Sequence, residues 1–265
     1  MNQINCTLPN LSIFSSLRAL YVDGNKLNGK IPKDIQFSPQ LKILYLNSNS
    51  LKGVLTDYHF ANMSNLDSLD LSDNSLALTF IQNWVPSFQL SKIGLRSCML
   101  GVVGNKLSGP IPAWIGSNMQ ELEILSLGSN HFNGSLPLQI CYLRSIQLLD
   151  LSMNNFFWAR KVPSNIGKLT SLEFLDLSRN QLVGSIPSSL TQIDRLTMLD
   201  LSHNHLAREI PTNTQLQSFN ISSYEDNFYL CGPPLEKLCI HGGQHQNQML
   251  KFMRINIRFS IVNFT

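Results

Sequence analysis

The sequence predicts an α/β solenoid of right-handed winding. In each coil a short strand joins a parallel β-sheet on the concave face, and a 3-10 helix or loop forms the convex face. An LxxLxLxxN phrase recurs every 24 or 25 residues in the clean stretches, and an xLxGxIP phrase follows most copies. The composition agrees, because 43 leucines and 26 asparagines stand among the 265 residues. Repeats in register at such a period indicate a stacked architecture.

The strand of each coil is predicted from the alternating leucines. Neighbouring side chains of a strand point to opposite faces, so the leucines of each LxL triplet point inward. No coil can bury its leucines alone, so we expect stacking and a sheet of about eight strands, each centred on a triplet. The triplets are Leu20–Val22, Leu44–Leu46, Leu69–Leu71, Ile93–Leu95, Leu125–Leu127, Leu149–Leu151, Leu175–Leu177 and Leu199–Leu201.

The asparagine that ends each phrase is predicted to lie in a sharp turn. Its side chain can bond backbone groups of its own coil and of the adjacent coil, so the asparagines should form a ladder. Cys98 takes the asparagine slot of one coil. The following glycine permits a tight backbone, and proline ends the strand. The ladder positions are Asn25, Asn49, Asn74, Asn130, Asn154, Asn180 and Asn204.

Several classes of protein receive no support. A net charge of +3, spread along the chain, gives no basic footprint for nucleic acid. No phosphate-binding glycine loop, kinase catalytic loop or nucleophile elbow is present, so we expect no enzyme and no cofactor. His203 and His205 flank Asn204 without a third ligand beside them, which predicts exposed loop histidines and no metal site.

These phrases resemble the plant-specific leucine-rich repeat. LDLSRNQLVGSIPSSL and LDLSHNHL look like the ectodomains of plant receptor-like proteins and receptor-like kinases. The segment from Ile210 to Cys239 resembles the C-terminal cap of receptor-like proteins of the disease-resistance type, and the resemblance covers about residues 6–239. It implies a plasma-membrane receptor without a kinase, which senses an extracellular ligand and signals through partner kinases in defence or development.

The repeats divide the chain into a partial repeat at 1–16, plant-type repeats at 17–211, a cap at 212–239 and a tail at 240–265 that we expect to be disordered. The repeats are irregular near 97–105, where Cys98 and Asn105 both fit the asparagine slot although seven residues separate them. We expect the least regular coil there, either as a true irregularity or as a gene-model error.

Two further departures concern a loop and the termini. Asn180 follows Asn154 by 26 residues, and Phe157, Trp158 and Arg160 lie where a GxIP phrase is usual. No signal peptide is visible at the start and no clean membrane span in the tail, although the family is anchored at the cell surface. We therefore expect a fragment, a truncated paralogue or a mispredicted gene.

A candidate ligand surface lies at the outward positions of the first strands. Tyr21 and Tyr45 occupy equivalent positions one coil apart, and tyrosine offers a large contact area at a low entropy cost. Asp23, Asn47 and Arg96 are their expected polar neighbours. The alternative is that the tyrosines only cover the sheet. Asp150, Asp176 and Asp200, each followed two residues later by serine, are expected to be structural.

A second candidate surface is a flank of the last coils, formed by Phe174, Arg179, Met198 and His203. In related plant receptors the C-terminal coils contact the ectodomain of a co-receptor kinase. An apolar and basic flank would suit such a partner.

Cysteines and glycosylation sequons complete the candidate positions. In the cap, Cys231 and Cys239 either form a disulfide that pins it over the last coil or remain free thiols in a reducing compartment. Cys141 is expected to point inward as a small apolar residue. Sequons for secretory glycosylation occur at Asn5, Asn10, Asn62, Asn133, Asn220 and Asn263.

The leading hypothesis is a non-catalytic binding module of a plant receptor-like protein, with a peptide, glycan or protein as ligand. One alternative is a soluble leucine-rich-repeat inhibitor similar to plant polygalacturonase-inhibiting proteins. Another is a truncated paralogue that folds without signalling.

Overall fold

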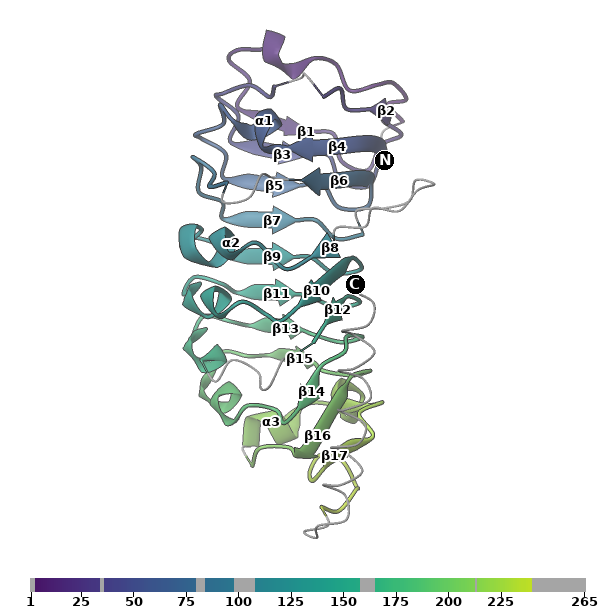
Figure 1. Cartoon of the computed structure of the whole chain (residues 1–265), viewed down its shortest axis with the longest axis vertical. Coiled ribbons are helices and arrows are strands. Elements are labelled where there is room, and N and C mark those ends of the chain that lie inside the picture. Colours follow the sequence, from purple (N-terminus) through teal and green to yellow (C-terminus); the bar gives the residue numbers. More distant parts are fainter. Residues whose placement is uncertain are drawn as a thin grey trace, which may run out of the picture.

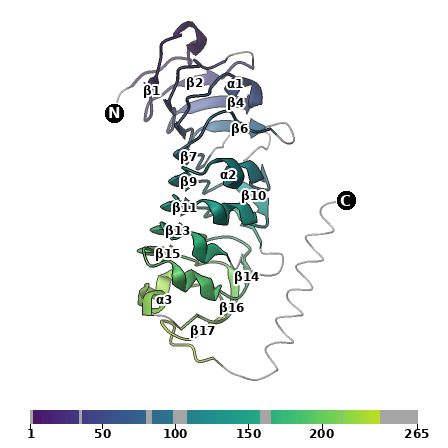
Figure 2. The ribbon, with the colours of Figure 1, turned by 90° about the vertical axis from the view of Figure 1, so that its left-hand side faces the viewer.

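The computed structural model describes residues 3–33, 36–79, 84–97, 108–157, 165–212 and 214–239. Its central feature is one eight-stranded parallel sheet with one strand per coil (Figure 1). The coils wind as a right-handed solenoid (Figures 1 and 2). In sheet order the strands are β1 (Ala19–Tyr21), β3 (Ile43–Tyr45), β5 (Ser68–Asp70), β7 (Lys92–Gly94), β9 (Ile124–Ser126), β11 (Leu148–Asp150), β13 (Phe174–Asp176) and β15 (Met198–Asp200).

The fold prediction is confirmed, with one shift of register. Each strand is centred on the first leucine of its LxL triplet, such as Leu44 of β3, and not on the middle residue. The second leucine still bonds to the next coil, since Leu46 N donates to Asp70 O at 2.9 Å. Two residues later the backbone turns into the left-handed region at Ser48, with φ of 55°, and this turn ends the strand.

Three further parallel sheets follow the turns, and Figure 1 shows them at the end of the main strands opposite the short helices. The asparagine turn is followed by an extended xLxG segment in most coils, and equivalent segments pair between coils. The first sheet joins β2 (Asn28–Lys30), β4 (Ser50–Thr56) and β6 (Ser75–Thr79); the second joins β8 (Ser108–Gly109), β10 (His131–Gly134) and β12 (Asn155–Phe156); the third joins β14 (Val183–Gly184), β16 (His205–Glu209) and β17 (Tyr229–Cys231).

Short helices complete the coils on the way back to the sheet. Figure 2 faces this side and shows β7 to β15 along one edge of the stack. Among the described residues, the α-helical segments are α1 (Asp57–Phe60), α2 (Ala113–Asn118) and α3 (Thr214–Ser218). The 3-10 helices are η1 (Leu11–Ile13), η2 (Leu138–Tyr142), η3 (Ile166–Lys168), η4 (Ser188–Gln192) and η5 (Ile221–Tyr224).

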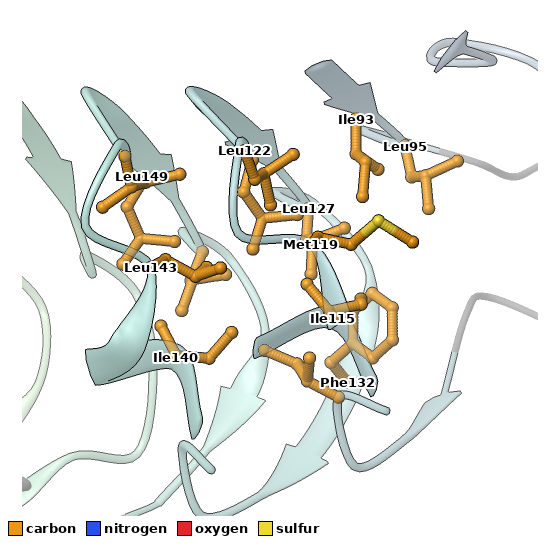
Figure 3. Packing of buried hydrophobic residues seen from close by; sticks show 14 of the residues in the cluster. Ile93, Leu95, Ile115, Met119, Leu122, Leu127, Phe132, Ile140, Leu143 and Leu149 are labelled. Atoms are coloured by element: carbon orange, nitrogen blue, oxygen red, sulfur yellow. The ribbon is translucent and has the colours of Figure 1, made fainter. Parts of the chain in front are cut away.

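One apolar cluster fills the interior from Leu8 to Leu230. Figure 3 shows how a coil contributes to it: Ile115 of α2 and Phe132 of β10 lie beside Leu122 and Leu127. Full burial of such a side chain stabilises the fold by roughly 1.5–3 kcal/mol. Because every coil packs against both neighbours, this contribution depends on an unbroken stack.

The asparagine ladder is present as predicted. Asn154 Nδ2 donates to Leu127 O of the preceding coil at 3.0 Å, and to Leu151 O and Ser152 O of its own coil at 3.2 and 3.0 Å. Its Oδ1 accepts from Phe132 N of the preceding coil at 3.0 Å. One side chain therefore satisfies four backbone groups of two coils.

The cap continues this ladder, which the sequence pattern did not reveal. Asn227 Nδ2 donates to Leu201 O at 2.9 Å, and its Oδ1 accepts from Leu206 N at 2.9 Å. The phenol of Tyr224 is buried and donates to Leu216 O at 2.6 Å, and burial raises its pKa above the usual range. A disulfide joins Cys231 of β17 to Cys239, which is the first of the two alternatives for these cysteines.

The irregular coil leaves the main sheet intact. Lys92 of β7 pairs directly with Ile124 of β9, although 32 residues separate them against 24 to 26 in the other coils of this sheet. β9 therefore follows β7 directly in the main sheet. We expected the irregularity near 97–105, and all of these residues except Ser97 lie outside the described residues.

Other predictions also fall on residues that are not described: the tail from 240 to 265, with its sequon at Asn263, and both Trp158 and Arg160. Within the described ranges, no helix is long and apolar enough to cross a membrane.

Candidate ligand-binding face

The outward face of the main sheet carries two rows of side chains, one on each side of the buried leucines. The row at the third strand position runs Tyr21, Tyr45, Asp70, Gly94, Ser126, Asp150, Asp176 and Asp200. The row at the first position runs Ala19, Ile43, Ser68, Lys92, Ile124, Leu148, Phe174 and Met198. From the row at the first strand position the sequence predicted only Phe174 and Met198, and it did not predict that the row continues across the sheet.

The predicted tyrosine pair is in contact. The rings of Tyr21 and Tyr45 lie 5.4 Å apart, edge to face, and Tyr21 is 57% exposed. The Tyr45 hydroxyl is 2.8 Å from Ser68 Oγ. Lys92 Nζ lies 4.6 Å from the centre of the Tyr45 ring and 3.4 Å from Asp70 Oδ2. We call Tyr21, Tyr45, Asp70 and Lys92 the tyrosine patch; it combines aromatic area with a cation and a carboxylate.

Arg96 does not join the tyrosine patch, contrary to our expectation from the sequence. Its guanidinium forms an ion pair with Asp150 two strands away, which is itself buried. The side chain passes over Gly128, where an added Cβ would lie 2.8 Å from Arg96 Nη1. Arg96 therefore bridges the middle of the sheet face, and the glycine leaves room for it. Asp23 and Asn47 lie two residues beyond Tyr21 and Tyr45, which end β1 and β3.

Asp150, Asp176 and Asp200 each brace the turn that follows their own strand. Asp176 Oδ1 accepts from Ser178 N at 2.9 Å, and Asp200 Oδ1 accepts from Ser202 N at 2.9 Å. Asp150 Oδ1 accepts from both Ser152 N and Ser152 Oγ. These bonds agree with the structural role expected for the repeated Asp-x-Ser.

Stacking also gives this row an electrostatic cost. Burial raises the pKa of Asp176, and the neighbouring carboxylates of Asp150 and Asp200 raise it further, against the lowering effect of the Ser178 hydrogen bonds. A folded-state pKa above the ordinary value means that the folded protein binds the proton more tightly than the unfolded chain does. Ionisation of Asp176 therefore destabilises the fold as pH rises from the ordinary value of 3.8 through the folded-state pKa.

Replacing Asp176 by Asn should raise the free energy of unfolding at pH 7 by roughly 0.2–1 kcal/mol, the range for cross-strand charge pairs. Asparagine keeps the oxygen that accepts from Ser178 N and removes the charge. The gain should shrink as the pH falls through the folded-state pKa and then 3.8, and it should vanish well below 3.8, where the wild-type carboxyl is protonated in both states. Urea unfolding followed by circular dichroism at several pH values measures it, with exposed Asp194→Asn as the control. An Asp176→Asn protein less stable than wild type at pH 7 would contradict this account.

The four residues of the predicted flank do not form one surface. Phe174 and Met198 begin β13 and β15 and are register partners on the sheet face. Arg179 and His203 lie in the turns beyond the opposite strand ends, with φ of 54° and 52°. His203 Nδ1 is 2.7 Å from Asp226 Oδ2, and its Nε2 is 3.6 Å from Glu225 Oε1.

The remaining predicted positions are mostly at the surface. Asn5, Asn10, Asn62 and Asn220 are exposed, and Asn133 is half-buried within β10. Cys141 is buried as expected, and burial raises the pKa of its thiol to about 11, so it stays protonated at neutral pH. In the described part of the chain, no three histidine, cysteine or acidic side chains gather as metal ligands.

Comparison with known proteins agrees with the repeat assignment. Two family models, both described as leucine-rich repeat, match residues 163–206 in one case and 16–37 and 121–143 in the other. Receptor-like protein EIX1 of Solanum lycopersicum is 38% identical over 134 residues, which cover 44% of this chain and 13% of that protein. Receptor-like protein 41 of Arabidopsis thaliana is 34% identical over 178 residues, which cover 65% of this chain and 19% of that protein. The chain is a homologue of plant leucine-rich-repeat receptor-like proteins. The matches span less than a fifth of either relative.

Several solved structures share the fold of this chain. The leucine-rich-repeat ectodomain of the Arabidopsis thaliana membrane receptor kinase GASSHO1/SCHENGEN3, in complex with CASPARIAN STRIP INTEGRITY FACTOR 2, superposes with a TM-score of 0.63 at 27% identity, over 89% of this chain and 33% of that one. The peptide hormone receptor RGFR1 from a plant, in complex with RGF2, gives 0.58 at 26%, over 88% and 44%. A plant ice-binding protein gives 0.65 at 27%, over 90% and 81%. The fold therefore serves more than one function, and the argument for this chain must come from its surface.

Proposed function

We propose that the chain is the non-catalytic ligand-binding module of a plant cell-surface receptor-like protein in defence or developmental signalling. Homology to receptor-like proteins and the fold shared with a peptide hormone receptor support a peptide or protein ligand ahead of a glycan. Partner kinases would carry the signal onward. The two alternatives predict the same solenoid. A soluble inhibitor would bind a pectin-degrading enzyme, and a truncated paralogue would fold without signalling.

The tyrosine patch is the observation that carries this proposal. Two tyrosines in edge-to-face contact form a continuous surface that is polar at its hydroxyl groups and apolar over its rings. Lys92 and Asp70 place one charge of each sign beside them. Asp23 and Asn47 extend the surface toward the turns. Interface hot spots favour such aromatic and charged clusters.

A co-receptor contact is proposed at the turns of the last coils, around Arg179 and His203. The acidic partners of His203 belong to the cap, so this contact would lie where the last coil meets the cap.

Replacing Tyr21 and Tyr45 together by alanine should weaken ligand binding by about 30-fold or more, because truncating one hot-spot residue costs about 2 kcal/mol. The leucine core is untouched, so the circular dichroism spectrum should not change. The measurement is a pull-down from plant extracellular fluid, followed by titration of the captured ligand.

The matched control replaces Tyr58 of α1 and Tyr142 of η2 by alanine. Tyr58 is 47% exposed and Tyr142 is 48% exposed, and both lie in short helices away from the sheet face. Equal loss in the two double variants, or none in either, would place the ligand elsewhere. Capture of a pectin-degrading enzyme as the main ligand would favour the inhibitor alternative.

A further inference from the structure

The C-terminal half of the sheet face differs from the tyrosine patch in composition. Here the row at the first strand position is an unbroken apolar stripe of four register partners, one each from β9, β11, β13 and β15. Met198, the last of them, is 53% exposed. The stripe is Ile124, Leu148, Phe174 and Met198. Ile124, Leu148 and Phe174 are partly buried and Met198 is exposed, so water contacts part of each apolar side chain across four strands.

The row at the third strand position lies beside this stripe and carries Asp150, Asp176 and Asp200 in the same coils. Asp150 is neutralised by Arg96, but Asp176 and Asp200 have no ion-pair partner among the described side chains. Asp176 Oδ1 accepts from Ser178 N and Asp200 Oδ1 accepts from Ser202 N, and both side chains remain partly exposed to a ligand. Burial raises the pKa of Asp176 and the carboxylates of Asp150 and Asp200 raise it further, so a nearby positive charge would favour its ionised form.

We propose that the stripe, together with Asp176 and Asp200 beside it, binds an extended peptide segment. The segment has apolar side chains at alternate positions and at least one lysine or arginine. The inference rests on the proposed binding function and specifies the ligand chemistry at a second part of the same face. Charge complementarity selects the occupant: an acidic row beside an apolar one matches a cationic, amphipathic segment and opposes an acidic one.

The dimensions agree with an extended segment that crosses the strands. Neighbouring strands of a sheet lie about 4.8 Å apart, so the stripe from Ile124 to Met198 is about 14 Å long. Alternate side chains of an extended peptide are about 6.7 Å apart, so three of them span about 13 Å. Five peptide residues would therefore lay three apolar side chains along the stripe, and a neighbouring cation can reach Asp176 or Asp200.

The test uses the full chain and fluorescently labelled, acetylated heptapeptides with alternating residues. One carries leucine and lysine, the second leucine and glutamate, and the third serine and lysine. Fluorescence polarisation should show the leucine–lysine peptide binding at least about tenfold more tightly than either of the others, since the binding needs both the apolar and the cationic side chains.

Two double variants locate the binding. Asp176→Asn with Asp200→Asn keeps both turn hydrogen bonds and should weaken the leucine–lysine peptide about tenfold while reducing its salt dependence. Phe174→Ser with Met198→Ser should weaken it at least as much. The charge-matched control, Asp73→Asn with Asp194→Asn, removes two exposed carboxylates from other parts of the molecule and should leave the affinity unchanged.

Three outcomes would overturn the proposal: no preference for the leucine–lysine peptide, no measurable binding of it, or equal loss in the charge-matched control. The last would indicate a nonspecific attraction of cationic peptides. The result is separable from the proposed function, because the Tyr21 and Tyr45 variant leaves the stripe intact and the stripe variants leave the tyrosine patch intact.

Discussion

Replacing Asn180 by alanine is expected to lower the free energy of unfolding by about 3 kcal/mol or more. Its Nδ2 donates to Leu151 O, Leu177 O and Ser178 O at 3.0 to 3.1 Å, and its Oδ1 accepts from Phe156 N at 3.0 Å. Alanine leaves these buried backbone groups unpaired, and each such group costs about 1–3 kcal/mol before the structure relaxes.

The same slot in the first coil supplies the control. Asn25 makes the equivalent bonds to Val22 O and Asp23 O and accepts from Ile4 N, but these groups are partly exposed. Water can replace the lost partners there, so Asn25→Ala should cost less than about 1 kcal/mol. Urea unfolding followed by circular dichroism compares the two variants. Similar losses in both would show that the ladder acts through the turn alone and not through burial.

The sequence predicted the parts of the fold that repeat. Leucines at fixed spacing in every coil determine the main sheet, and the asparagine slot determines the ladder, because each side chain meets the same partners in each coil. The three smaller sheets were not predicted, since strands as short as Val183–Gly184 leave no alternation to detect. Asn227 was missed because the leucine spacing ends before the cap.

The candidate site was predicted only in part, because the partner that a long side chain contacts depends on which residues of other coils lie near it. The spacing of Tyr21 and Tyr45 gave their contact. Lys92 was missed, although the strand alternation continues one position before the first leucine. The ion pair of Arg96 depends on a path over Gly128, and the glycine at this outward position was the available signal.

Replacing Cys231 and Cys239 together by serine should lower the free energy of unfolding by about 2–3 kcal/mol. The disulfide joins two cysteines that are eight positions apart in the sequence, and opening it restores chain entropy to the unfolded state. The bond also holds β17 in place, where Leu230 pairs with Arg208 and Cys231 with Glu209 of β16. Without it the cap should separate first, because a solenoid loses its terminal coil most easily.

The control for this experiment is Cys6→Ser, which removes the exposed free cysteine and should change the urea midpoint little. Adding dithiothreitol to the wild type should reproduce the double serine variant, since both open the same loop. An unchanged midpoint in the double variant would mean that the packing of Tyr224 and Leu230 holds the cap without the disulfide.

Loss of the cap should affect ligand binding differently at the two ends of the sheet face. β15 is the last strand of the main sheet and contacts η5 of the cap, so fraying from this end removes Met198 and Asp200 first. The leucine–lysine peptide should then bind the double serine variant more weakly than wild type at moderate urea concentrations. The tyrosine patch lies on β1 to β7, at the other end of the stack, and should keep its ligand under the same conditions. Parallel loss of both activities would indicate that the solenoid unfolds as one cooperative unit and that the cap stabilises all of its coils together.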